Sequence, residues 1–122
     1  MAARTKANNP RLQPRIRILR HSDIAIGPGK AELLALVGQT GSIGEAAKRM
    51  KMSYMRAWLL IQTMNECFKQ PVVATVRGGR NRGGAELTTT GRKALELYEQ
   101  MEERSLRAIE GTWRRFRQLL RN

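Results

Sequence analysis

The sequence is poor in the residues from which most active sites and metal centres are built. Its 122 residues include a single cysteine, Cys67, and a single histidine, His21. One cysteine leaves no intrachain disulfide and no cysteine-rich zinc site, and its spacing from the histidine fits no metal-ligand pattern. A serine or cysteine nucleophile would have only His21 to activate it. We therefore expect no enzyme, no metal and no cofactor.

Long apolar runs are also missing. The longest, residues 33–37 and 57–61, fall far short of the ~20 residues of a transmembrane helix. The polar first ten residues lack the apolar core of a secretory signal. The sequence predicts no membrane partner and a cytoplasmic protein, and a single cysteine agrees with a reducing compartment.

Acidic residues are few and unevenly placed. The chain has 23 Lys and Arg against 10 Asp and Glu, a formal charge of +13. Three blocks contain bases but no acid, namely residues 1–22, 46–65 and 67–85, whereas half of the acids lie within residues 96–110. Such segregation produces a local positive potential that attracts a polyanion. The charge pattern therefore favours nucleic acid as the partner.

Local patterns predict a mainly α fold with a small β hairpin. Residues 1–14 contain two prolines and show no periodicity, which predicts a flexible basic arm. Residues 15–20 begin with alternating polar and apolar positions, so we expect an edge strand with Ile16 and Ile18 facing inward. The apolar spacing of residues 30–39 predicts a first helix.

Two further helices are predicted on either side of a tight turn. Ser42 and Glu45 form a capping box, in which the serine oxygen accepts an N–H and the glutamate reaches back to the serine N–H. A short helix then starts at Ile43, and Lys51-Met52 makes the turn. Ser53 caps a third helix, which extends to about residue 68. Its expected buried stripe consists of Ala57, Trp58, Ile61, Met64 and Phe68, with either Leu59 or Leu60 exposed.

A hairpin and a long helix complete the chain. Residues 72–76 and 85–88 predict two strands, and the segment 77–84 between them holds four glycines and three arginines. Such a tip can approach another backbone closely. A helix is expected from residue 90 to about residue 120, with a heptad seam that needs a partner. We expect a homodimer formed through that seam, which consists of Leu106, Ile109, Trp113, Phe116 and Leu120.

This order of elements is that of a winged helix-turn-helix. In such a domain the N-terminal turn of the third helix enters the major groove of double-stranded DNA, and the wing reaches neighbouring phosphates or the minor groove. Arg56 is expected to read guanine with two hydrogen bonds. The candidate DNA-binding residues are Ser42, Ser53, Tyr54, Met55 and Arg56 on the helices, and Arg77, Arg80, Asn81 and Arg82 in the wing.

Four motifs resemble one known family. They are Gly41-Ser-Ile-Gly-Glu-Ala-Ala, Ser53-Tyr-Met-Arg-Ala-Trp, the glycine-rich segment 78–88, and Gly91-Arg-Lys-Ala-Leu-Glu-Leu-Tyr. Over about residues 25–105 the chain resembles the N-terminal DNA-binding domain of ModE-type molybdate-responsive transcriptional regulators, and more distantly the LysR-type helix-turn-helix. The resemblance implies a bacterial or archaeal regulator, a homodimer, a palindromic operator and control of molybdenum-related genes.

The sequence departs from that family in two ways. ModE-type proteins continue into a molybdate-binding domain, whereas this sequence stops at Asn122, so we expect no such domain and no small-molecule effector within the chain. Met55 stands where many relatives carry a base, so the base preference is expected to differ. The expected organisation is an arm at 1–14, a winged helix-turn-helix at 15–92 and a dimerisation helix at 93–122.

Alternatives to this regulator remain open from sequence. The charge also suits an architectural DNA-binding protein that tolerates any sequence. The long helix would also suit an interaction module that pairs with a separate sensor subunit. Its end is basic and amphipathic, as in helices that lie on membrane surfaces, and Trp113 and Phe116 could instead fold back on their own core. The main expectation is a cytoplasmic, nucleoid-associated regulator.

Overall fold

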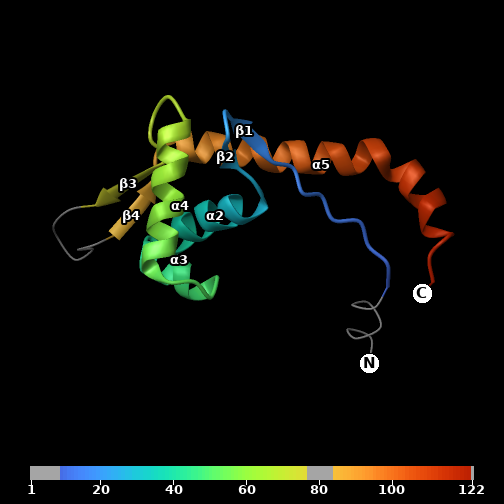
Figure 1. The fold of residues 1–122 in the computed structure, drawn as a ribbon, viewed down its shortest axis with the longest axis horizontal. Coiled ribbons are helices and arrows are strands. Elements are labelled where there is room, and N and C mark those ends of the chain that lie inside the picture. The colour runs from blue at the N-terminus through green and yellow to red at the C-terminus, as the bar shows by residue number, and fades with distance from the viewer. Residues whose placement is uncertain (1–8, 77–83, 122) are drawn as a thin grey trace. The chain divides into compact units, whose positions relative to one another are not determined.

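The computed structural model describes residues 9–76 and 84–121. Along the chain the elements are β1 (Ile18–Arg20), β2 (Asp23–Ile26), α2 (Pro28–Thr40), α3 (Ile43–Arg49), α4 (Tyr54–Cys67), β3 (Val73–Val76), β4 (Gly84–Leu87) and α5 (Thr89–Arg117) (Figure 1). Arg15–Glu99 forms one compact unit, and Gln100–Asn122 belongs with Met1–Pro14 to a second. The helices α2 to α5 and the strands β3 and β4 confirm the predicted mainly α fold with a small hairpin.

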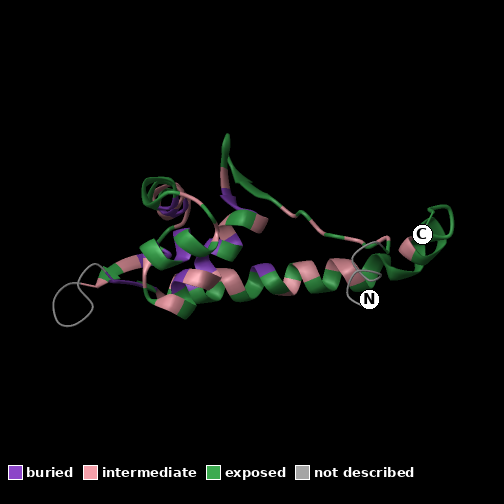
Figure 2. Cartoon of the chain, turned by 90° about the horizontal axis from the view of Figure 1, so that it is seen from below, coloured by how far each residue is buried: buried purple, intermediate pink, exposed green. Residues whose placement is uncertain are grey.

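The core of Arg15–Glu99 lies where α2, α3 and α4 contact one another. Small side chains at Ala46, Ala47 and Ala57 let the helices approach closely, and all three are buried. Figure 2 shows the buried parts of the chain in purple. Larger apolar side chains fill the remaining space, since dense packing maximises the dispersion contacts that a core gains on folding. The fully buried ones on these helices are Leu33, Leu34, Val37, Ile61 and Met64.

The hairpin β3–β4 is antiparallel, with Val73 opposite Leu87 and Val76 opposite Gly84. Val73, Ala85 and Leu87 are buried, and β4 contacts α2. Both predicted strands are therefore confirmed to within one residue.

A second antiparallel pair, β1–β2, is only half predictable from the sequence. The alternating pattern indicates an edge strand at 15–20, but it gives no sign of β2 with its buried Ala25 and Ile26. The expected inward position of Ile18 is wrong, because this side chain is 38% exposed, whereas Ile16 does pack against the core. The pairing register shifts between Ile18 and Leu19, and such an irregularity breaks the strict alternation of faces on which the prediction relies.

The start of β3 is bonded to α4 on one side and to the β4–α5 corner on the other. Asn65 on α4 accepts the Val72 N–H at 2.8 Å and the Val73 N–H at 3.3 Å, and its amide donates to the Val73 carbonyl at 3.3 Å. The Thr88 N–H donates to the Val72 carbonyl at 3.0 Å. Thr88 also caps α5, since its hydroxyl oxygen accepts the Gly91 N–H at 3.0 Å. One residue, Val72, thus connects three elements.

The long helix contributes its first turns to the core of Arg15–Glu99. Tyr98 is buried, and its hydroxyl donates to the carbonyl of Ile16 at 2.7 Å. The compact unit ends at Glu99. The predicted division into an arm, a winged helix-turn-helix and a dimerisation helix stays a prediction. At its other end α5 stops at Arg117, so Leu120 lies beyond the helix, in a turn closed by its own N–H and the Arg117 carbonyl at 3.0 Å.

We predict that Gly91→Ala destabilises the domain. A Cβ at Gly91 would lie 2.0 Å from the Val72 carbonyl oxygen, and this neighbour is backbone that cannot turn aside. The free energy of unfolding should fall by about 1–3 kcal/mol, the range for overpacking, as measured by urea denaturation.

Gly111→Ala provides a matched control on the same helix, because a Cβ there meets no atom within 4 Å. It should raise helix stability by up to about 1 kcal/mol. Equal stabilities for the two variants would show that α5 does not lie directly against the Val72 carbonyl.

Candidate nucleic-acid interface

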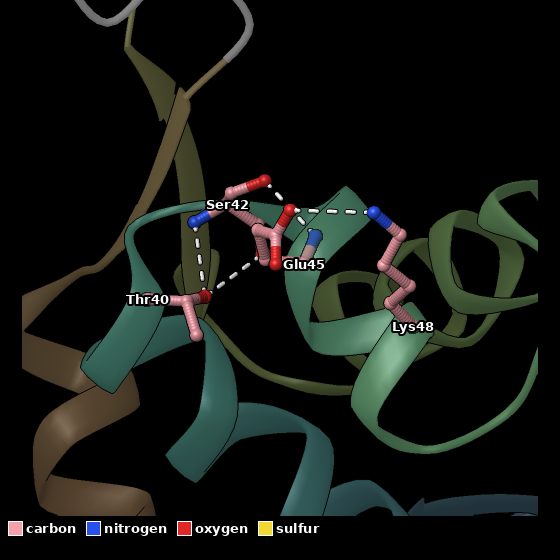
Figure 3. Close-up of polar contacts among 4 residues, drawn as sticks. All are labelled: Thr40, Ser42, Glu45 and Lys48. Carbon is pink, nitrogen blue, oxygen red and sulfur yellow. Dashed lines mark hydrogen bonds and ion pairs between the residues drawn. The ribbon is translucent and has the colours of Figure 1, made fainter.

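The short helix α3 begins at Ile43 because Ser42 caps it. The Ser42 hydroxyl oxygen accepts the Glu45 N–H at 3.1 Å (Figure 3). The second half of the predicted capping box is wrong, because the Ser42 N–H donates to the Thr40 hydroxyl oxygen at 3.2 Å. The Glu45 carboxylate instead lies 3.9 Å from the Lys48 ammonium. Thr40 replaces Glu45 as the acceptor of the Ser42 N–H because it is the last residue of α2 and lies only two positions before Ser42.

The turn between α3 and α4 occupies Lys51 and Met52, as predicted. Lys51 adopts a left-handed φ of 57°, which reverses the chain direction. The Met52 N–H donates to the Ala47 carbonyl at 3.0 Å. The Ser53 hydroxyl oxygen then accepts the Arg56 N–H at 3.1 Å and starts α4. The turn and both serine caps together fix how the first turn of α4 is presented.

That first turn brings four of the candidate residues together on one exposed surface. Ser53, Tyr54, Met55 and Arg56 are all exposed, and the next residue, Ala57, is fully buried. Ser42 is only half-buried, but its hydroxyl is engaged in the α3 cap. The four wing candidates, Arg77, Arg80, Asn81 and Arg82, lie outside the described residues.

Two further side chains extend this surface along α4. Trp58 was expected in the buried stripe, but that prediction is wrong, because the side chain is 37% exposed. Leu59 is also exposed and Leu60 is partly buried, which settles the choice that the sequence leaves open. Ala57, Ile61 and Met64 alone form the fully buried stripe. An exposed tryptophan gives little signal in sequence, because its type favours a core position.

The exposed face of α4 carries cationic and apolar groups together. No acid lies in its first turn, and among the ion pairs of residues 9–76 and 84–121 none involves Arg56. Its guanidinium is exposed, and a guanidinium presents a planar fork of N–H donors of the kind that can pair with guanine in the major groove. Met55 and Leu59 lie one turn apart, and apolar side chains in this groove contact the methyl group of thymine.

Other kinds of site find no support in the described ranges. Residues 9–76 and 84–121 contain no cluster of histidine, cysteine or carboxylate side chains that could hold a metal ion. Within the same ranges no helix combines the length and the apolar character needed to cross a membrane.

Comparison with known proteins places the chain. No family model matches the sequence. The sequence is 39% identical over 85 residues to the molybdenum-pterin-binding protein MopB of Rhodobacter capsulatus, covering 70% of this chain and 32% of MopB. It is 40% identical over 77 residues to the transcriptional regulator ModE of Haemophilus influenzae, covering 63% and 30%. The chain carries a ModE-type helix-turn-helix domain.

The chain spans about a third of the length of these relatives, so the similarity covers one domain of each. Solved structures agree on the fold of this ModE-type domain. The structure described as the CbnR_DBD-DNA complex matches with a TM-score of 0.54 at 20% identity, covering 69% of this chain and 91% of that one. ArgP from Mycobacterium tuberculosis matches with a TM-score of 0.52 at 25% identity, covering 72% and 31%.

In this ModE-type domain, Ser53→Ala should lower the free energy of unfolding by about 1 kcal/mol, because an N–H in the first turn of α4 loses its acceptor. Ser53→Asp preserves an acceptor and should retain most of the stability. Urea denaturation of the three proteins provides the measurement, and an alanine variant as stable as the aspartate variant would contradict the capping role.

Proposed function

We propose that this chain is a sequence-specific DNA-binding transcriptional regulator that acts as a homodimer on a palindromic operator. The exposed, acid-free first turn of α4 is the observation that carries the proposal, because its residues present hydrogen-bond donors and apolar groups from a rigid helix. Names of relatives add support, among them the DNA-binding transcriptional dual regulator ModE of Escherichia coli, which is 32% identical over 83 residues, covering 68% of this chain and 32% of that relative.

Each candidate on α4 has a role in this proposal. The first turn of α4 enters the major groove, and the Arg56 guanidinium donates to the acceptors of one guanine. Met55 and Leu59 contact thymine methyl groups beside it. Ser53 and Tyr54 hydrogen-bond to phosphates at the groove edge, as hydroxyl groups commonly do. An apolar Met55 in place of a base moves the preference of this position toward thymine.

Ser42 and the wing residues supply contacts that carry less sequence information. The side chain of Ser42 would contact the phosphates of one DNA strand. Arginines in the wing would neutralise phosphates or enter the minor groove, and their support is the acid-free, glycine-rich sequence. These wing residues are Arg77, Arg80, Asn81 and Arg82.

The homodimer is proposed through the second half of α5. Ile109 and Phe116 are 45% and 55% exposed. The rings of Trp113 and Phe116 stack with centroids 6.4 Å apart, and together with Leu12 they line an apolar groove. Large apolar side chains in this arrangement need a cover, and the same seam of a second copy provides one, with Leu106 at its start and Leu120 just beyond the helix end.

A two-fold symmetric pair of domains would read two half-sites on one face of the duplex, which is why the operator is palindromic. The proposal includes no catalytic activity, no membrane partner and no effector site within these residues, and it places the protein in the cytoplasm on the nucleoid. Relatives such as the molybdenum transport protein ModE of Azotobacter vinelandii, 40% identical over 78 residues, support molybdenum-related genes as targets.

Arg56→Ala should remove base discrimination at one position of each half-site. The expected loss is about 1–3 kcal/mol against the preferred base, without a change elsewhere in the site. Selection of bound sequences from random duplexes at a stated salt concentration measures this effect. Lys69→Ala, beyond the C-terminal end of α4, is the control and should retain the wild-type preference. Wild-type protein that binds selected and random duplexes equally well would instead be an architectural binder.

Phe116→Glu should convert a dimer into a monomer, because it places a charge within the apolar seam that the two copies would share. Static light scattering measures the mass directly. Leu119→Glu is the matched control, since Leu119 is 82% exposed and lies off the heptad positions. A wild-type protein that is monomeric alone, and dimeric only with a second polypeptide, would instead support the interaction module.

A further inference from the structure

A pocket of about 320 Å³ lies beside the exposed turn of α4. Four cationic side chains line it, and they come from separate parts of the chain: Arg15 and Arg17 before β1, Lys30 on α2, and Arg56 on α4. No acidic residue is among its lining residues. Arg15 and Arg56 are 41 positions apart in sequence, so only the tertiary fold brings them to the same pocket.

Contacts within the fold position two of these four cations, Lys30 and Arg17. Lys30 donates from its ammonium group to the Ile24 carbonyl, which leaves its other N–H donors for a ligand. A Cβ at Gly27 would lie 3.3 Å from Arg17 Cγ, so the lack of a side chain there lets the stem of Arg17 lie against the start of α2. Apolar side chains complete the lining, namely Ile24, Pro28, Met50, Met52 and Leu60.

Arg15, Arg17 and Arg56 are exposed and Lys30 is half-buried, and like charges gathered around one hollow give it a positive potential that attracts an anion. None of the ion pairs within residues 9–76 and 84–121 involves Arg15, Arg17, Lys30 or Arg56. An anion in this pocket would meet four cationic side chains and no acidic one. Arginine and lysine donors converging on one point suit the oxygens of a phosphate group.

We propose that this pocket binds one backbone phosphate of the DNA that α4 reads. The inference rests on the proposed function and adds a second contact to it. Arg56 belongs both to the base-reading turn and to the pocket lining. The major groove is only ~12 Å wide, so a helix that touches base edges has a phosphate backbone immediately beside it. The pocket opens where that backbone passes, and it fixes the register of the domain along the duplex.

The first measurement is the salt dependence of affinity. An Arg15→Gln, Arg17→Gln double variant should lower the slope of log affinity against log salt by about 0.9, the value for one phosphate that the protein no longer neutralises. Affinity should drop roughly 10- to 100-fold, as for charge-assisted hydrogen bonds, and by the same factor for preferred and random duplexes. The control is Lys69→Gln with Lys93→Gln, which removes the same charge from exposed positions outside the pocket and should keep the wild-type slope. Equal slopes for the pocket and control variants would overturn the proposal.

The second measurement locates the contact. A series of duplexes carries one neutral methylphosphonate at each successive position near the half-site. Wild-type protein should lose affinity at one position flanking the bases read by α4, and the double variant should be insensitive to the change at that same position. A series in which wild type and variant respond identically at every position would refute the phosphate contact.

A free anion is the other source of the same chemistry, and inorganic phosphate is the probe for it. Saturable binding of inorganic phosphate that requires Arg17, combined with an unchanged DNA salt slope in the variant, would assign the pocket to a soluble anion and overturn our proposal. The two hypotheses fail separately. If the Arg56→Ala selection succeeds while the slopes stay equal, only the pocket is wrong. If wild-type protein shows no preference among duplexes, the proposed regulator is wrong whatever the slope.

Discussion

The close approach of α5 to the residue just before the wing hairpin is the constraint on which the domain depends. Gly91 has no side chain, and this lets the helix lie directly against the Val72 carbonyl. Val72 also receives the Thr88 N–H at its carbonyl and gives its own N–H to Asn65 on α4. Buried backbone groups must find partners, and Val72 finds them on α4 and on the β4–α5 corner. The direction in which α4 leaves the core is therefore set together with the direction of α5.

The surface of α4 follows from that packing. Ala57, Ile61 and Met64 are committed to the core, so a helix with many apolar residues still has to expose Met55 and Leu59. Large exposed apolar groups are tolerated in a folded domain when a ligand covers them. Arginine beside them adds directional donors, and no acid in the first turn neutralises it. The mixture suits a groove that offers both acceptors and methyl groups, and the neighbouring cationic pocket extends it toward the backbone.

Much of this fold could be predicted, because the signals are local. Apolar spacing and the serines before α3 and α4 place both helices to within one residue of their observed starts. The errors have different physical causes. Thr40 supplies the acceptor that Glu45 was expected to provide, and a register shift turns Ile18 outward. The pocket has no local signal at all, since its cations lie on three segments whose meeting depends on tertiary packing.

Acidic side chains offset part of the positive charge of α5. Half of the acids fall within residues 96–110. Two of them form exposed i, i+4 pairs, Glu103 with Arg107 and Glu110 with Arg114, and the latter spans 3.0 Å. Such pairs add only about 0.3–0.5 kcal/mol each to the helix. Their larger effect is electrostatic, because each glutamate offsets the positive charge of one arginine on the exposed helix. The pocket cations beside α4 form no such pair within residues 9–76 and 84–121, so no neighbouring acid neutralises the positive potential there.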